Sequence, residues 1–277
     1  MSFLQHFRSR KRIPFARWGC RVCDLQLPTD GFVQYAYWLH PNITPHVFHQ
    51  DEVDGLRTFL RPGQFAIDIG AQGGDTTVPM ALAAGPTGCV LALEPNPNVF
   101  EVLEVNAALN RAKTNIQPRC FAATETDGQF VFHYCDASFC NGGFRSQQRW
   151  KFFRRKHPLT IAGRNLLAVL RDDFAEWLPK LAYVKVDAEG YDRAILESIM
   201  PVLRETRPVI RTEVYRKLMN GERRALFDLL VDNGYEPYRF QGGSAPQGQR
   251  MTRQTMTDEK HFDLLAIPTP QRAQKAA

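Results

Sequence analysis

The sequence lacks the long apolar runs that membrane-spanning segments require. None of its apolar runs approaches the roughly 20 residues that a helix needs to cross a bilayer. The first 20 residues are basic, but they lack the apolar core of about 7–15 residues that marks a secretory signal peptide. These two absences predict a cytoplasmic protein.

Cysteine is also scarce, with six residues in a chain of 277. Their scattered spacing does not predict a disulfide framework. Cys20 and Cys23 form a C-x-x-C pair that could begin a zinc site, but such a site needs a second pair of ligands. The only candidates, Cys135 and Cys140, are distant and unusually spaced. We therefore expect reduced, mostly structural thiols.

Basic side chains are unevenly distributed in a chain whose net charge is +6. Residues 8–21 and 145–157 each carry six basic residues and no acidic one, and the second segment interleaves aromatic residues. This pattern suits an anionic polymer or a membrane surface. No recognised nucleic-acid-binding module surrounds either segment, so we favour solvated surface segments over a nucleic-acid partner. Peripheral membrane contact through the basic N-terminus is left open, and no feature predicts an oligomeric state.

Strand-like and helix-like segments alternate over residues 50–268, which predicts one α/β domain with a doubly wound, mostly parallel sheet. The last two predicted strands have no long helix between them and suit an antiparallel pair at one edge of that sheet. The remaining segments are a basic and aromatic N-terminal extension at 1–49, an insertion over the predicted site at 135–165, and a disordered tail at 269–277.

Carboxylates stand near the carboxyl ends of four predicted strands, which is the edge where open α/β sheets bind their ligands. One acid at such a position is commonly a helix cap, but four at corresponding positions favour a functional site. These residues are Asp68, Glu94, Asp187 with Glu189, and Glu213.

A glycine-rich turn follows the first of these carboxylates in the stretch "AIDIGAQGGD". Gly70, Gly73 and Gly74 do not match the dinucleotide-binding pattern G-x-G-x-x-G, and the chain contains no phosphate-binding G-x-x-x-x-G-K-[ST] pattern. An acid before the turn suits a cationic or hydroxyl-bearing ligand better than a pyrophosphate. Glu94, which ends the next strand, is positioned to accept both ribose hydroxyls. An adenosine with a positive tail and no phosphates, such as S-adenosylmethionine, satisfies this pattern.

The chain resembles the FkbM-type methyltransferases over roughly residues 50 to 215. The most specific parts of the resemblance are the runs "EPNP", which begins at Glu94, and "KVDAEG", which spans Lys185 to Gly190. The run "NGGF", which begins at Asn141, resembles a small polar patch of the family. Gln72 stands where the family usually has asparagine.

The resemblance implies a Rossmann-like class I methyltransferase fold, with a seven-stranded sheet and an antiparallel edge strand. It also implies S-adenosylmethionine as cofactor and a hydroxyl group of a sugar or complex natural product as acceptor. The residues expected to bind the cofactor are Asp68, Gly70, Gln72, Gly73, Gly74, Glu94 and Asn96. Those expected on the substrate side are Asn141 and Glu213.

The four residues that begin at Asp187, directly after a predicted strand, predict the kind of acceptor. Asp187-Ala188-Glu189-Gly190 has none of the Pro-Pro-aromatic or Pro-Cys signatures of nucleobase methyltransferases, and a carboxylate suits proton removal from a hydroxyl group. We expect Asp187 to be the catalytic base, with Glu189 second. An ordinary Asp pKa of about 3.9 is a poor match for a sugar hydroxyl, so burial, a histidine or a metal would have to assist.

Several further roles stay open at this stage. Glu213 could complete an oxygen-ligand divalent-metal site with Asp187 and Glu189, although helix capping or substrate hydrogen bonding is preferred, and no metal is assigned. His133 and His157 are expected at the surface, and Lys185 is expected to pair with a carboxylate of the site. The alternatives to a glycan or small-molecule O-methyltransferase are an RNA-binding methyltransferase that uses the two basic segments, and a catalytically dead scaffold.

Overall fold

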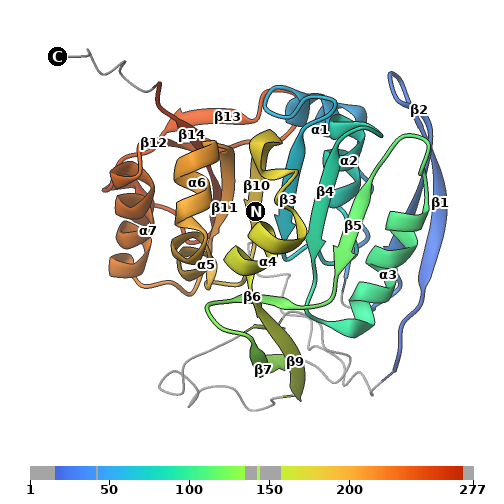
Figure 1. Ribbon diagram of the computed structural model, residues 1–277, viewed down its shortest axis with the longest axis horizontal. Coiled ribbons are helices and arrows are strands. Elements are labelled where there is room, and N and C mark those ends of the chain that lie inside the picture. The colour runs from blue at the N-terminus through green and yellow to red at the C-terminus, as the bar shows by residue number, and fades with distance from the viewer. Residues whose placement is uncertain (1–15, 42, 135–141, 144–156, 271–277) are drawn as a thin grey trace, which may run out of the picture.

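The computed structural model describes residues 16–41, 43–134, 142–143 and 157–270 of the chain. Eight strands form the central sheet, in the order β13-β12-β14-β11-β10-β3-β4-β5 (Figure 1). The parallel strands run from β5 to β11, and β14 pairs antiparallel with both β11 and β12. The bounds of the eight strands are β3 Phe65–Ile69, β4 Cys89–Leu93, β5 Ile116–Arg119, β10 Leu181–Val186, β11 Val209–Val214, β12 Tyr235–Phe240, β13 Gln247–Arg250 and β14 Phe262–Pro268.

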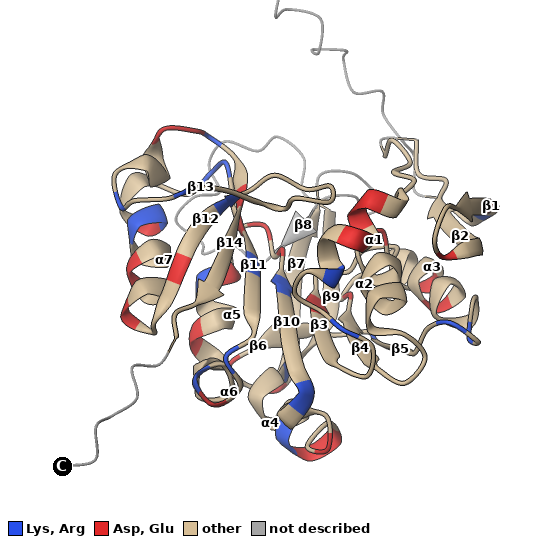
Figure 2. Ribbon diagram, turned by 90° about the horizontal axis from the view of Figure 1, so that it is seen from above, with Lys and Arg blue, Asp and Glu red and all other residues tan. Residues whose placement is uncertain are grey.

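Helices cover both faces of this sheet (Figure 2). Side chains alternate along β3, so that Phe65, Ile67 and Ile69 enter one apolar core while Ala66 enters the other. The first core is shared with α4 to α7, and the second with α1, α2 and α3. The bounds are α1 Gln50–Arg57, α2 Thr77–Ala84, α3 Pro97–Ala108, α4 Leu166–Asp173, α5 Asp192–Ser198, α6 Met200–Thr206 and α7 Asn220–Asp232, with short 3₁₀ helices at Leu178–Lys180 and Thr255–Thr257.

The doubly wound, mostly parallel class I architecture is therefore confirmed, with one more strand than predicted. The additional strand β13 has the sequence QGQR and pairs with β12, outside the antiparallel strand β14. Its polar sequence carries no alternating apolar signal, so periodicity could not find it. Helices α5 and α6 follow each other directly, and the break between them lies next to Pro201.

A second sheet lies at the end of the central sheet where β6, β7 and β9 are seen in Figure 1. Its strand order is β6-β9-β7-β8, with bounds β6 Ala122–Thr124, β7 Gly128–Tyr134, β8 Gly142–Gly143 and β9 His157–Asn165. The last part of the predicted insertion is thus strand β9, which pairs antiparallel with β7. Residues 135–141 and 144–156, with the candidate Asn141 and most of the second basic segment, lie outside the described residues, as do residues 1–15 and the expected disordered tail from 271 onward.

An N-terminal hairpin, β1 Cys20–Leu27 and β2 Gly31–Trp38, packs against α3. At this contact the Asn106 side chain bonds to both backbone polar groups of Ala36, as a neighbouring strand would. It accepts from Ala36 N at 2.8 Å and donates to Ala36 O at 2.7 Å. Its amide also donates to Gly73 O at 2.6 Å, in the glycine-rich turn. Asn110 makes the equivalent pair of bonds with Gln34. The hairpin and the glycine-rich turn are therefore joined through one buried side chain.

We expect Asn106→Ala to lower the free energy of unfolding by about 3 kcal/mol. The substitution leaves the N–H and C=O of Ala36 and the C=O of Gly73 without this partner, and each buried group left unsatisfied costs about 1–3 kcal/mol. Urea denaturation measures the loss. Glu104→Ala, at an exposed position of the same helix, is the matched control and should change stability by less than about 0.5 kcal/mol. A loss below about 1 kcal/mol for Asn106→Ala would contradict this account of the hairpin.

Across the described residues, no helix is long and apolar enough to span a membrane.

Candidate functional site

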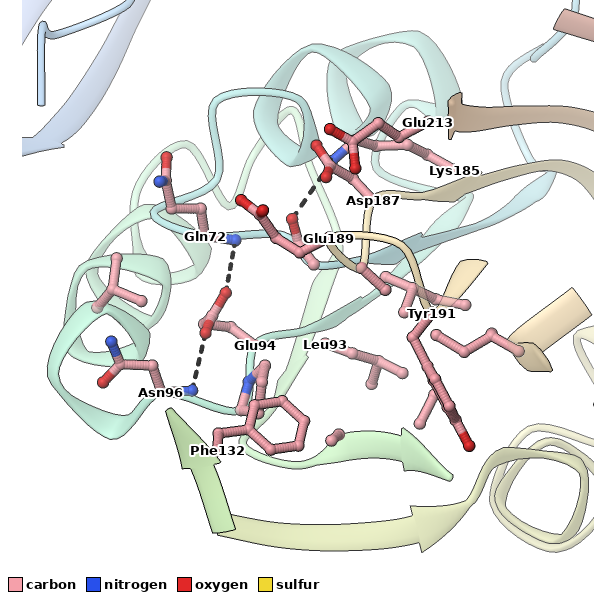
Figure 3. Close-up of a pocket in the computed structure, with 18 of the residues that line it drawn as sticks. Gln72, Leu93, Glu94, Asn96, Phe132, Lys185, Asp187, Glu189, Tyr191 and Glu213 are labelled. Carbon is pink, nitrogen blue, oxygen red and sulfur yellow. Dashed lines mark hydrogen bonds and ion pairs between the residues drawn. The ribbon is translucent and has the colours of Figure 1, made fainter. Parts of the chain in front are cut away.

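A cavity of about 470 Å³ lies beyond the carboxyl ends of the parallel strands. Residues that follow β3, β4, β10 and β11 line it, and Phe132 and Tyr134 of β7 and Trp38 of β2 also reach it. Figure 3 shows Glu94 and Asn96 on one side of this space, and Lys185, Asp187 and Glu213 on the other. The cavity thus joins the ends of the strands that the sequence analysis singled out.

The glycine-rich turn brings neighbouring chain segments into close contact. Gly70 has a φ of +79°, and a Cβ at this position would lie 2.0 Å from Asp187 O, so any other residue would force the two strand ends apart. Gly70 and Ala71 both donate their N–H to Leu93 O. Gln72, which also has a positive φ of 50°, lines the cavity.

Gly73 and Gly74 face away from the cavity and toward α3. A Cβ on Gly73 would lie 3.3 Å from the Val102 side chain, and one on Gly74 would lie 3.2 Å from the Leu103 side chain. These two expected cofactor-binding residues therefore allow α3 to approach the turn, and they do not line the cavity. Of the three glycines, Gly70 is the one that does.

Glu94 is held with its carboxylate facing the cavity. Its Oε2 accepts from Gln72 N at 3.0 Å and its Oε1 accepts from Asn96 N at 2.8 Å (Figure 3). Burial raises the pKa of Glu94 to about 7, although both backbone N–H groups partly oppose this shift. Each carboxylate oxygen can accept two hydrogen bonds, so the two oxygens keep room for two further donors. A vicinal diol such as that of ribose supplies two donors at this spacing.

Asn96 has a structural role beside its place on the cavity wall. It is the N-cap of α3, and its Oδ1 accepts from Asn98 N at 3.0 Å. Its backbone N–H fixes Glu94, so the start of α3 orients the carboxylate at the end of β4. The sequence analysis expected direct cofactor contact here and did not anticipate the cap.

A buried network lies beneath the cavity at the centre of the sheet. Asp68 is fully buried, accepts from Thr77 Oγ1 at 2.7 Å, and lies 3.3 Å from Lys185 Nζ. Lys185 is also 3.7 Å from Asp187 Oδ2 and donates to Gly70 O. Burial disfavours the ammonium, but the nearby carboxylates outweigh it and hold the pKa of Lys185 above its usual range. Asp68 therefore does not line the cavity, and it contacts the site through Lys185.

Three carboxylates gather in the other half of the cavity. The Asp187 side chain is 46% exposed, Glu189 stands in the turn after β10 with a φ of 54°, and Glu213 lies near the end of β11. Glu213 is buried, and its Oε1 lies 3.4 Å from His261 Nδ1. Burial, reinforced by Asp187 and other nearby acids, raises the pKa of Glu213 well above its usual range and favours the protonated carboxyl. In its protonated form this carboxyl can donate a hydrogen bond into the cavity.

Asp192 shapes the turn that carries Asp187 and Glu189, and the sequence analysis did not identify it. The carboxyl of Asp192 accepts from Gly190 N at 3.1 Å and from Ala188 N at 3.4 Å. Burial raises its pKa to about 7. Its position at the start of a helix was the available signal. His261, Trp38 and Phe132 also line the cavity without having been predicted, because they reach it from distant parts of the chain.

The other expected residues are placed as follows. Lys185 pairs with carboxylates, as predicted. His157 is on β9 and His133 on β7, and neither is among the residues that line the cavity. Within the described ranges, no group of three or more His, Cys, Asp or Glu side chains has the arrangement of a metal site.

Comparison with known proteins identifies the family. Residues 68–237 match the FkbM methyltransferase domain. A protein-L-isoaspartate O-methyltransferase of Triticum aestivum is 28% identical over 92 residues, which are 33% of this chain and 36% of that protein. The chain thus spans about a third of the length of this curated relative.

Solved structures also resemble the chain at low identity. An O-methyltransferase from Bacillus cereus, in complex with SAH, is 15% identical with a TM-score of 0.45, covering 82% of this chain and 84% of that one. The methyltransferase FkbM from Methylobacillus flagellatus is 14% identical with a TM-score of 0.43, covering 78% of this chain and 51% of that one. The domain match covers more than half of the sequence and confirms the resemblance that the sequence motifs indicated. The chain belongs to the FkbM family of S-adenosylmethionine-dependent methyltransferases.

Proposed function

We propose that this protein transfers the methyl group of S-adenosylmethionine to a hydroxyl group of a sugar, a glycoconjugate or a related natural product. The observation that carries the proposal is a cavity with the carboxylate of Glu94 in one half and the carboxyl groups of Asp187, Glu189 and Glu213 in the other. Carboxylates accept hydrogen bonds from hydroxyl groups, and a polyhydroxylated acceptor matches several of them at once. Tyr191 adds aromatic surface on which the apolar face of a sugar ring can pack.

When bound, the cofactor supplies an electrophilic methyl group on a positively charged sulfur. Asp187 is the proposed base, because its carboxylate is accessible from the cavity and accepts the proton that leaves the acceptor hydroxyl as the new carbon–oxygen bond forms. Lys185 holds that carboxylate from below, and the turn organised by Asp192 fixes its backbone. The enzyme otherwise aligns the acceptor oxygen and keeps water away from it.

Glu189 and Glu213 are proposed to bind the acceptor. Glu189 faces the cavity from the same turn as Asp187 and is the second candidate for the base. The raised pKa of Glu213 favours a protonated carboxyl, which would donate a hydrogen bond to an acceptor oxygen, whereas ionised carboxylates only accept. The site therefore offers both donors and acceptors to a polyol.

We expect cofactor affinity to fall as the pH is lowered from 8 to 6. The pKa of Glu94 is about 7, so its carboxyl is ionised above this value and takes up a proton below it, which removes an acceptor for a ribose hydroxyl. Calorimetry with S-adenosylhomocysteine should show Kd rising several-fold at the lower pH. Glu94→Gln is the matched control and should bind with a pH dependence that is flat by comparison. If Kd changed equally with pH in the wild type and in Glu94→Gln, the pH dependence would have to come from another titrating group.

The alternative proposal, an RNA-binding methyltransferase, depends on two basic segments of which residues 16–21 and 157 are described. Arg17, which belongs to the first of them, forms an exposed ion pair with Glu101 at 3.3 Å. No contact of the described residues favours this function over the first. The cytoplasmic location stays a prediction, and membrane contact through the basic N-terminus stays open.

A panel of acceptors tests the proposed function. The protein is incubated with methyl-labelled S-adenosylmethionine and, separately, with glycans, lipid-linked sugars and RNA. We expect label in a hydroxyl-bearing glycan or lipid-linked sugar. Label in RNA alone, with a binding constant that falls steeply with salt, would support the RNA-binding alternative.

A further inference from the structure

The N-terminal hairpin reaches the cofactor half of the cavity, although it lies outside the family domain. The domain match begins at residue 68, whereas Trp38 ends strand β2. Trp38 nevertheless lines the same cavity as Glu94, Asn96 and Val99. Its side chain belongs to a small apolar cluster with Val99 and Val102 of α3. The extension therefore contributes to the wall of a site whose other cofactor-side residues belong to the methyltransferase domain.

The polar end of the Trp38 side chain is already engaged by the protein. Its Nε1 donates to Trp18 O at 2.8 Å. The ring packs on His40, with 4.6 Å between ring centroids and 35° between the planes. An indole has one donor and no acceptor, so Trp38 has only apolar, aromatic surface to offer a ligand. It is suited to a flat or apolar part of a ligand and cannot hydrogen-bond to an amino acid or a hydroxyl group.

The neighbours of Trp38 in the cavity wall indicate which part of the cofactor it would face. Asn96 and Val99 belong to the first turn of α3, directly after the carboxylate that is placed to hold the ribose. Asp187 follows β10 and Glu213 lies near the end of β11, and β3 separates these strands from β4. Figure 3 shows the same separation between Glu94 and Glu213. Trp38 thus stands on the nucleoside side of the cavity, away from the carboxylates of the acceptor half.

The hairpin is fixed relative to the glycine-rich turn. Asn106 binds both polar groups of the Ala36 backbone, two residues before Trp38, and also binds Gly73 O. Leu39 N, on the other side of Trp38, donates to Gly19 O at 2.9 Å. These contacts hold the indole in place at the cavity wall before a ligand binds. Less conformational entropy of the Trp38 side chain is therefore lost on binding.

We propose that Trp38 is a cofactor-binding residue that packs its indole against the adenosyl group of S-adenosylmethionine, so that the N-terminal hairpin forms part of the cofactor site. The inference rests on the proposed function for the identity of the ligand. It extends the cofactor site to a segment that lies outside the matched family domain, and to a residue that the sequence alone did not single out.

Calorimetry with S-adenosylhomocysteine tests the proposal. We expect Trp38→Ala to raise Kd about tenfold, as loss of aromatic stacking on a nucleobase does in other sites, and Trp38→Phe to raise it no more than about threefold. Methylthioadenosine, which lacks the amino-acid tail, should lose affinity for Trp38→Ala by the same factor. The melting temperature of each variant is measured in the same buffer, and Trp38→Leu replaces Trp38→Ala if the latter is not folded.

Intrinsic fluorescence gives a second readout that a purely structural role would not change. Titration with S-adenosylhomocysteine should quench the tryptophan emission of the wild type and of Trp177→Phe, because Trp177 does not line the cavity. The quenching should be lost in Trp38→Phe. Unchanged affinity in a folded Trp38→Ala or Trp38→Leu variant would overturn the proposal, as would weakened binding of S-adenosylhomocysteine with unchanged binding of methylthioadenosine. A wild type that binds neither ligand would contradict the proposed function itself.

Discussion

Glu94→Ala should raise the Kd for S-adenosylhomocysteine by at least about a hundredfold. Both carboxylate oxygens are oriented by backbone N–H groups and keep two lone pairs toward the cavity, where the ribose hydroxyls would lie. A hydrogen bond to a charged group contributes about 1.5–3 kcal/mol, so the loss of two such bonds costs about 3–6 kcal/mol. At about 1.4 kcal/mol for each factor of ten, this corresponds to a loss of two or more orders of magnitude. Calorimetry measures it directly.

The substitution also removes the acceptor for Gln72 N and Asn96 N, so a folding defect must be separated from a binding defect. Glu94→Gln keeps the size of the side chain and one acceptor oxygen, and it should weaken binding by about tenfold. A folded Glu94→Ala protein, identified by its cooperative thermal unfolding, that binds within about threefold of the wild type would refute the ribose-binding role of Glu94.

Asp187→Asn should retain cofactor binding but lose turnover. The amide has the shape of the carboxylate and cannot accept the hydroxyl proton, and removal of a general base costs about 10²–10⁴-fold in rate. We expect kcat to fall within this range while Kd for S-adenosylhomocysteine stays within about twofold. Steady-state kinetics with the acceptor found in the labelling panel, together with calorimetry, measures both quantities.

Glu189→Gln is the matched control for this prediction, because it changes a carboxylate of the same turn to an amide. If Glu189 only binds the acceptor, the main effect should be a higher KM with a fall in kcat of no more than about tenfold. Unchanged turnover in Asp187→Asn, with a large loss in Glu189→Gln, would transfer the base role to Glu189.

The central sheet and the carboxylates at its edge could be predicted because they depend on local pattern and simple topology. Buried apolar runs such as Phe65–Ile69 and Cys89–Leu93 predict parallel strands, and parallel strands bring their carboxyl ends to one edge of the sheet. Glu94, Asp187, Glu189 and Glu213 therefore line one cavity as expected. Asp68 was assigned to the same edge, but its place within β3 instead of after it buries it beneath the site.

The remaining features depend on contacts between segments that are distant in the sequence. Gly73 and Gly74 were expected to face a ligand, but the approach of α3 determines their role, and one sequence carries no local sign of that approach. Trp38 and His261 reach the cavity only through the packing of the hairpin and of the segment before β14. Strand β9 was interpreted as part of an insertion because a long polar segment separates it in the sequence from β7, the strand with which it pairs. Tertiary packing, and not propensity, decided each of these cases.

The atom that receives the methyl group tests the central claim most directly. The protein is incubated with S-adenosylmethionine labelled with carbon-13 in its methyl group and with the glycan or lipid-linked sugar that accepts label, and the product is analysed by NMR. The account predicts a methyl ether on a hydroxyl-bearing carbon, formed by the wild type and not by Asp187→Asn. A methyl group on nitrogen, on carbon or on a carboxylate oxygen, or equal product formation by both proteins, would contradict it.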